Sequence, residues 1–304
     1  MPDNSEPWYL RKLRDKVRLL NASVQKHFAA PPDVPPPDPE LYQAAVEELR
    51  RLETDGPGGR AYLEKHIPRL ARTLTLIPRP NLSRRALELG CYMQITPALH
   101  FLLGYQEVRG GYYGPPGRID HKCVHPGGRK FECDVDHFDA ERDRFPYPDN
   151  HFELVLVCEM IEHLLYDPMF MLLEIRRVLE EGGRMLISTP NLASIASVAS
   201  LLEGRDNPQI FSIYTRPRPG EEADIPHVRE YTADELGRTV QAAGFEVETL
   251  FTENIPEYDH HRHLLGFLQE NGYDIRLRGE QTYCIGIKRE TLPVIRYPRW
   301  LYTE

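Results

Sequence analysis

Between residues 85 and 290 the sequence alternates short apolar runs with segments of helical spacing, and this alternation constrains the fold more than any other feature. The apolar runs predict strands at residues 86–89, 107–108, 130–133, 154–158, 184–189, 246–251 and 283–288. Helices are expected at residues 96–103, 168–179, 194–202 and 232–243. Strands that alternate with helices form parallel sheets, in which ligands bind beyond the carboxyl ends of the strands. The sequence therefore predicts an α/β, Rossmann-like fold whose site lies in the loops after the strands.

Segments on either side of this core predict further parts. Residues 1–30 have helical spacing, and the prolines of residues 31–39 predict an extended linker. Helical spacing returns in residues 40–84, which we expect to form a cap on the core of residues 85–290. Two stretches of the core, residues 193–226 and 253–278, follow late strands and would cover the substrate side. The aromatic and basic tail, residues 291–304, could pack on the domain or on a second subunit.

Composition narrows the class of protein. The chain has 304 residues, 41% of them hydrophobic and 27% charged, which fits a globular protein. Its 46 acidic residues outnumber its 37 Lys and Arg residues, and the net charge of −9 disfavours nucleic acid as a partner. Five cysteines without a C-x-x-C pair, and no apolar segment after Met1, predict a cytoplasmic protein without a membrane span.

The segment from Phe145 to Leu164, FPYPDNHFELVLVCEMIEHL, is the most informative part of the chain. Together with RVLEEGG at residues 177–183, it closely resembles class I S-adenosylmethionine (SAM)-dependent methyltransferases of the type 11 kind. In that family an F-P-x-x-D-x-x-F-D strand leads into the centre of the sheet, and an R-V-L-x-x-G-G turn precedes the next strand. The resemblance runs from about residue 86 to residue 288. It implies a seven-stranded sheet with helices on both faces and SAM as the cofactor.

The first cofactor motif departs from the family pattern. The sequence LELGCYMQ of residues 87–94 keeps Glu88 and Gly90, but Tyr92 and Gln94 replace the later glycines that let the backbone approach the cofactor. No acidic residue stands in residues 108–114 to hold the ribose hydroxyls. The resemblance implies these cofactor residues: Glu88, Gly90, Tyr92, Asp134 as the adenine-side carboxylate, and Cys158 at a strand end. Either the loop still binds SAM at a shifted angle, which we favour, or Tyr92 fills the methionine slot and SAM binding is lost.

A candidate metal site follows the strand that ends at Cys158. If a helix begins there, Glu159, Glu162 and His163 stand at i, i+3 and i+4 on one face, within reach of one ion. This E-x-x-E-H element resembles the divalent-metal site of plant small-RNA 2′-O-methyltransferases and ubiquinone-pathway O-methyltransferases, and the resemblance implies His227 as a fourth ligand. Oxygen and nitrogen ligands together suit Mg²⁺, Mn²⁺ or Fe²⁺. The alternative is a metal-free site, in which the carboxylates cap a helix and the histidine faces the substrate.

These residues predict a SAM-dependent O-methyltransferase, assisted by a divalent metal, that acts on a hydroxylated small molecule such as a sugar or a secondary-metabolite precursor. The metal would lower the pKa of the attacked hydroxyl, and His163 or His227 would take its proton. Side chains suited to such an acceptor occur in the substrate-side stretches: Tyr214, Arg216, Arg218, Tyr258 and Arg262. Two other classes stay open, a non-catalytic Rossmann-like binding protein and a different enzyme that uses SAM or a metal on this fold.

Overall fold

The computed structural model describes residues 36–54, 56–204, 207, 226–254 and 261–303. The predicted N-terminal helical segment and most of the proline-rich linker lie outside these residues. So do Tyr214, Arg216, Arg218, Tyr258 and the side chain of Arg262. Of the helices that the structure describes, none combines the length and the apolar character needed to cross a membrane.

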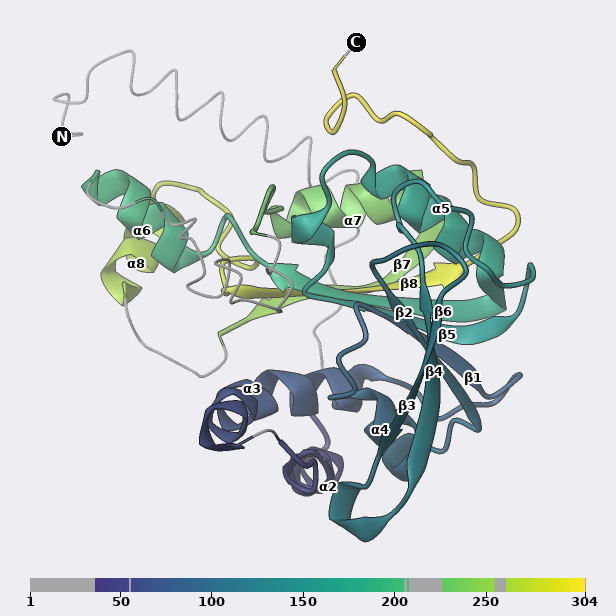
Figure 1. Cartoon of the computed structure of the whole chain (residues 1–304). Helices are drawn as coiled ribbons and strands as arrows, with labels where there is room; N and C mark the ends of the chain where they lie inside the picture. Colours follow the sequence, from purple (N-terminus) through teal and green to yellow (C-terminus); the bar gives the residue numbers. More distant parts are fainter. Residues whose placement is uncertain (1–35, 55, 205–206, 208–225, 255–260, 304) are drawn as a thin grey trace, which may run out of the picture.

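In the described part of the chain, eight strands form one mixed sheet (Figure 1). They are β1 (Arg85–Leu89), β2 (Glu107–Tyr112), β3 (Ile119–Val124), β4 (Phe131–His137), β5 (Phe152–Cys158), β6 (Leu179–Pro190), β7 (Phe245–Glu253) and β8 (Gln281–Lys288). Their order across the sheet is β3-β4-β2-β1-β5-β6-β8-β7. The central strands β4, β2, β1, β5 and β6 are parallel, whereas β8 is antiparallel to both of its neighbours. The predicted α/β, Rossmann-like fold is confirmed.

The sheet has one strand more than the expected seven, the edge strand β3. It pairs antiparallel with β4, from Ile119 opposite Asp136 to Val124 opposite Phe131. None of its six residues is buried. Because the strands were predicted from apolar runs, a solvated edge strand rich in charged residues gave no such signal. The extra strand extends the sheet on the side of the predicted cofactor half.

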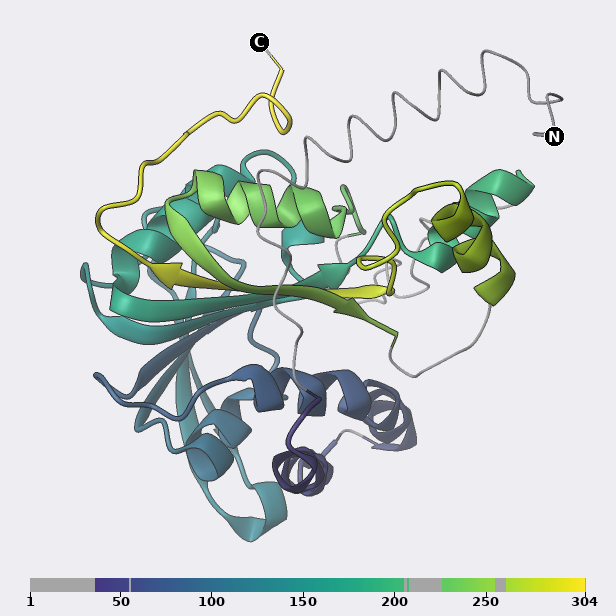
Figure 2. The same ribbon diagram turned by 180° about the vertical axis from the view of Figure 1, so that it is seen from behind.

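Helices cover both faces of the sheet (Figures 1 and 2). One face carries α2 (Pro39–Arg50), α3 (Gly56–Leu76), α4 (Thr96–Ala98) and the π-helical turn η1 (Leu99–Leu103), and the other carries α5 (Pro168–Val178) and α7 (Ala233–Ala242). Side chains that alternate along the strands supply both layers. Ala86 and Leu154 belong to the core cluster that includes α3, whereas Leu87 and Val155 belong to the cluster that includes α5 and α7.

The remaining elements lie at the margins of these layers. Two 3-10 turns, η2 (Pro126–Gly128) and η3 (Ile161–His163), connect strands to the next elements, and α6 (Ile195–Glu203) lies beside α8 (Arg262–Glu270) (Figures 1 and 2). The C-terminal tail runs back over α5 and α7. The N–H of Ile295 donates to the carbonyl of Ala242 at 2.7 Å, and the indole N–H of Trp300 donates to Thr239 Oγ1 at 3.4 Å.

Candidate active site

The loop after β5 carries three of the predicted metal residues to the carboxyl edge of the sheet. β5 ends at Cys158, and Glu159 follows with a φ of +50°. Glu159 and Met160 are not helical, so the expected helix from Glu159 is wrong. Glu162 and His163 belong instead to the single 3-10 turn η3. The i, i+3, i+4 argument that placed Glu159 beside them therefore fails.

His227 reaches the same turn from a segment far along the chain. The backbone carbonyl of Glu162 accepts the N–H groups of Val228 at 2.8 Å and of Arg229 at 3.1 Å, which ties the segment of His227 to η3. Glu162, His163 and His227 each offer one ligand atom, and these atoms lie within 4.8 Å of one another. The two imidazole rings meet edge to face, with centroids 4.9 Å apart. Three of the four predicted metal residues thus come together.

Glu162 is fully buried, and only one of its two carboxyl oxygens has a hydrogen-bond partner among the described residues. The hydroxyl of Thr189, on β6, donates to its Oε2 atom at 2.8 Å, but Oε1 has no hydrogen-bond partner among the described residues. Removal from water, with Glu159 nearby as a smaller contribution, raises the pKa of the Glu162 carboxyl to about 8. Without a cation, burial therefore favours the protonated form of this group.

His227 is held by a carboxylate of its own segment. Its Nδ1 atom lies 3.1 Å from Oε1 of Glu230. This hydrogen bond, opposed by partial burial, raises the pKa of His227 above its ordinary value. Since Nδ1 is engaged, Nε2 is the nitrogen left for a ligand.

Glu159 lies apart from this cluster. Its Oε1 atom accepts hydrogen bonds from Ser188 Oγ at 2.8 Å and from Gln281 Nε2 at 2.7 Å, and it pairs with Arg69 of α3 at 3.4 Å. Consecutive residues of β6 explain the separation: Ser188 and Thr189 point to opposite faces of the sheet, and each binds one of the two glutamates. Glu159 thus contacts α3 and is not part of the group formed by the other three residues, and its role as a metal ligand stays a prediction.

The chemistry of the remaining donors fits a divalent cation. A buried carboxylate with an unpaired oxygen and two histidines form a mixed oxygen and nitrogen set with open positions. Thr189 forms a hydrogen bond with Glu162, and Glu230 forms one with His227. Such hydrogen bonds commonly orient the side chains that bind a metal. The cluster therefore fits the implied ion with three ligands from the chain instead of four.

The cofactor loop after β1 packs directly on the end of β2. The N–H groups of Gly90 and Cys91 both donate to the carbonyl of Gly111, at 2.9 and 3.1 Å. A Cβ atom on Gly110 would lie 2.8 Å from the Cys91 side chain, and one on Gly111 would lie 2.8 Å from Leu89. Gly110 and Gly111 therefore let the side chains of Cys91 and Leu89 pack directly against the backbone of β2.

Glu88 and Tyr92 have opposite environments. Glu88 is buried and accepts the Thr96 hydroxyl at 2.5 Å, and its burial raises its pKa well above the ordinary range. Tyr92 is 63% exposed and meets the ring of Tyr112 edge to face, with the two hydroxyls 3.3 Å apart. An exposed ring does not fill an internal slot, which argues against the interpretation of Tyr92 as a plug.

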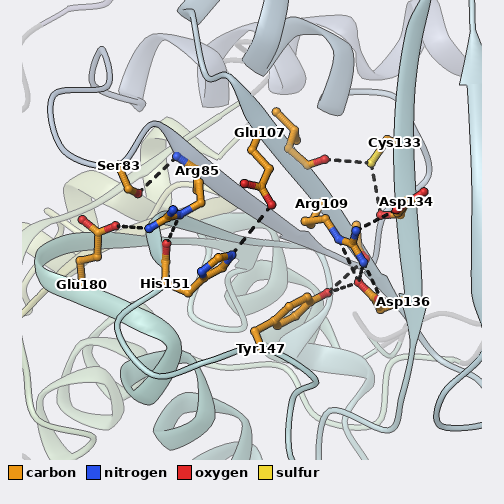
Figure 3. Close-up of polar contacts among 12 residues, drawn as sticks. Ser83, Arg85, Glu107, Arg109, Cys133, Asp134, Asp136, Tyr147, His151 and Glu180 are labelled. Carbon is orange, nitrogen blue, oxygen red and sulfur yellow. Dashed lines mark hydrogen bonds and ion pairs between the residues drawn. The ribbon is translucent and has the colours of Figure 1, made fainter.

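Asp134 lies within β4 and not in the loop beyond it. It is the fourth residue of β4, and its carboxylate binds Arg109 at 2.8 Å and His121 at 2.5 Å. Figure 3 shows Arg109 between Asp134 and Asp136. The strand ends three residues later, and Asp139 is the acidic residue just beyond that end. This position argues against Asp134 as the adenine-side carboxylate, a role that stays a prediction from the sequence, and it makes Asp139 the alternative candidate.

Two residues that the sequence did not single out face the same edge. Arg69 of α3 reaches Glu159, and Tyr283 of β8 is fully buried with a hydroxyl that has no hydrogen-bond partner among the described residues. Burial, with Glu159 and Glu253 as smaller contributions, raises the pKa of Tyr283. Cys158 also ends here, and removal from water raises the pKa of its thiol to about 12. Arg69 lies ninety residues before Glu159 in the chain, so motif spacing gave no signal for it.

The sheet order and the residues at its carboxyl edge define a Rossmann-like fold of the methyltransferase type. A family model for the methyltransferase domain matches residues 60–250, more than half of the chain. The chain therefore belongs to this family of SAM-dependent methyltransferases.

Individual relatives match only part of the chain or have low sequence identity to it. A protein of Mycolicibacterium smegmatis, described as a probable S-adenosylmethionine-dependent methyltransferase, is 35% identical over 103 residues, 34% of this chain and 32% of the relative. The chain thus spans about a third of the length of this curated relative. Among solved structures, the methyltransferase bound to the Trm112 activator of Haloferax volcanii covers 82% of this chain and 98% of its own, at 14% identity and a TM-score of 0.49. A SAM-dependent methyltransferase of Archaeoglobus fulgidus covers 75% and 99%, at 18% identity and a TM-score of 0.46.

Proposed function

We propose that the chain is a SAM-dependent O-methyltransferase that uses a divalent cation and acts on a hydroxylated small molecule. One observation supports the cation above all others: the buried Glu162 has a carboxylate oxygen without a hydrogen-bond partner among the described residues, beside two histidines. A buried carboxylate that lacks compensation is costly, and a bound cation would remove that cost. Family membership supports SAM as the methyl donor.

Glu162, His163 and His227 would hold the cation, which when bound lowers the pKa of an acceptor hydroxyl. The chain's own residues keep these ligands in place. Thr189 fixes one oxygen of Glu162, and Glu230 fixes Nδ1 of His227. In a metal-free site, Nε2 of His227 would be the atom that accepts the proton of the attacked hydroxyl.

SAM would lie across the carboxyl ends of β1, β2 and β4, between the loop at Gly90 and the turn at Asp139. Tyr92 and Tyr112 would flank its ribose side, where the acidic residue of the family is missing. Arg69 of α3 would offer its guanidinium group to the carboxylate of the methionine moiety. Its present partner, Glu159, contacts it at 3.4 Å, so part of its donor set is available for a second carboxylate.

The acceptor that we propose is a sugar or a secondary-metabolite precursor with a free hydroxyl group. The two substrate-side stretches contain tyrosine and arginine residues, whose aromatic faces and guanidinium donors suit such acceptors. The net charge of −9 disfavours a nucleic acid. The five cysteines are free, which supports the cytoplasm as the compartment.

A methyl-transfer assay tests the proposal. Chelator-treated protein would be incubated with SAM that carries a labelled methyl group and with a panel of sugars, catechols and other hydroxylated compounds. We expect transfer to one acceptor class that returns on addition of Mg²⁺ or Mn²⁺ and is lost in Glu162→Gln. Full transfer by a demonstrably metal-free preparation, with His227→Ala also active, would show that the cation has no part in the reaction.

A further inference from the structure

Glu141 is a buried carboxylate whose partners are backbone N–H groups. It follows β4 in a tight turn and is 8% exposed. Its Oε2 atom accepts the N–H of Leu165 at 2.9 Å, and Oε1 accepts those of Tyr166 and Asp167, both at 2.6 Å. Three charge-assisted hydrogen bonds from consecutive residues compensate the burial of one carboxylate.

The turn that carries Glu141 is itself fixed. The N–H of Glu141 donates to Oδ1 of Asp139 at 2.9 Å, and the N–H of Asp139 donates to Oδ2 of Asp143 at 2.8 Å. The carboxylate is therefore presented from a defined point at the carboxyl end of β4. Residues 165–167 are in this way held to the sheet, and not only to their neighbours in the chain.

Residues 165–167 continue directly from the proposed cation ligands. The turn η3 ends at His163, two residues before the first N–H group that Glu141 binds. On the other side of the turn, the N–H of Glu159 donates to the carbonyl of Ser188 at 2.9 Å. Glu162 and His163 thus lie on a short segment that is held at both ends, by β6 and by Glu141.

We propose that Glu141 is a positioning residue for the cation site, which fixes the backbone from which Glu162 and His163 reach the ion. This inference rests on the proposed cation-assisted function. Replacing the carboxylate by a carboxamide turns an NH₂ group toward backbone N–H donors and leaves at least one of them without an acceptor. Changes in the groups around metal ligands typically alter metal affinity by 10- to 100-fold.

Glu153 provides a matched control. It is 5% exposed, and its two oxygens likewise accept backbone N–H groups, of Asn81 at 2.6 Å and of Arg84 at 2.9 Å. It stands at the start of β5, on the amino edge of the sheet, whereas the cation site lies at the carboxyl edge. Glu153→Gln therefore introduces the same chemical defect away from the site.

The experiment titrates Mn²⁺ into chelator-treated wild type, Glu141→Gln and Glu153→Gln by calorimetry, at a temperature where thermal unfolding shows all three to be folded. We expect Glu141→Gln to weaken Mn²⁺ binding by about tenfold or more. Glu153→Gln should change the affinity by less than about twofold although it also loses stability. Equal affinities for the two variants would overturn the proposal.

A second readout does not depend on the metal. In metal-free protein labelled with ¹⁵N-histidine, the imidazole signals of His163, assigned with a His163→Gln variant, should move in Glu141→Gln and stay in place in Glu153→Gln. A wild type that binds no Mn²⁺ would refute the cation in the proposed function, and the imidazole signals would then decide on Glu141 alone. Unchanged His163 signals in Glu141→Gln would refute its positioning role.

Discussion

Glu162 shows how much one buried carboxyl group can require of its surroundings. Its folded-state pKa of about 8 lies above the ordinary glutamate value of 4.5, chiefly because the side chain is removed from water. A group whose pKa is raised by folding stabilises the fold fully below its unfolded pKa, and that contribution is lost as the pH rises toward the folded pKa. In the absence of a cation, Glu162 therefore destabilises the protein progressively between pH 4.5 and 8.

This pH dependence can be measured with Glu162→Gln, which has no titrating group. In the presence of a chelator, the unfolding temperature of the variant minus that of wild type should increase by several degrees from pH 5 to pH 8. Over this range the unfolded wild type loses the Glu162 proton more readily than the folded wild type does, so only the wild type loses stability through this group. Thermal unfolding followed by circular dichroism gives both values. The same difference in unfolding temperature at both pH values would mean that folding does not raise the pKa of Glu162.

Asp134 and Asp139 are the two candidates for the carboxylate on the adenine side of SAM, and their alanine variants distinguish between them. Asp139→Ala should weaken SAM binding by about tenfold, the range for a lost hydrogen bond to a charged group. Asp134→Ala should change it much less, since Asp134 binds Arg109 within the sheet. Calorimetric titration with SAM measures both. A larger loss for Asp134→Ala would restore the assignment made from the sequence.

At the level of elements, the C-terminal tail clamps the start of α5. Asp167 caps the helix by accepting the N–H of Phe170 at 3.1 Å, and it also binds the Tyr302 hydroxyl at 2.6 Å and the Arg296 guanidinium group. Partial burial opposes ionisation of Asp167, but the hydrogen bonds from Arg296 and Tyr302 prevail and lower its pKa. The carboxylate thus joins a helix cap to a tail more than a hundred residues away in sequence.

Removal of this contact should destabilise the protein in a pH-dependent way. We expect Arg296→Ala to lose about 1 kcal/mol at pH 7. A lowered carboxyl pKa stabilises the fold above the unfolded pKa, near 3.8 for aspartate, and the gain is lost below it. The deficit should therefore shrink as the pH falls below about 4. Urea unfolding measures it, with the exposed Arg299→Ala as the control; an equal deficit in both variants would contradict the clamp.

At the level of the whole molecule, the helical layer of α3 supplies contacts to the carboxyl edge. Arg69 binds Glu159, and one turn further Arg72 binds Glu253 through two nitrogens. If Arg69 contacts the carboxylate of SAM, Arg69→Gln should weaken SAM binding by about tenfold or more, whereas Arg72→Gln should affect mainly stability. Calorimetry and thermal unfolding of the two variants separate these effects. Equal SAM affinities would remove Arg69 from the cofactor site.

Sequence patterns predict the buried strands of the sheet but not the contacts that depend on how distant elements pack together. Apolar runs such as residues 154–158 correctly predicted the buried parallel strands, because these strands are covered on both faces. The solvated strand β3 has no apolar run, and the φ of +50° at Glu159 cannot be inferred from a spacing rule that assumes a helix. The contact between Arg69 and Glu159 depends on how a distant helix packs on the sheet. His227 was identified only because the resemblance to metal-dependent families supplied a second segment.

Crystals of the protein grown with Mn²⁺ would test whether Glu162, His163 and His227 form a cation site. Anomalous diffraction near the manganese absorption edge locates the ion without reference to any assumed ligand. We predict one peak per chain, bonded to a carboxylate oxygen of Glu162 and to one imidazole nitrogen each of His163 and His227, with Glu159 still bound to Ser188 and Gln281. A map without a peak at these three residues, or with a peak bonded to Glu159 instead, would contradict the proposed site.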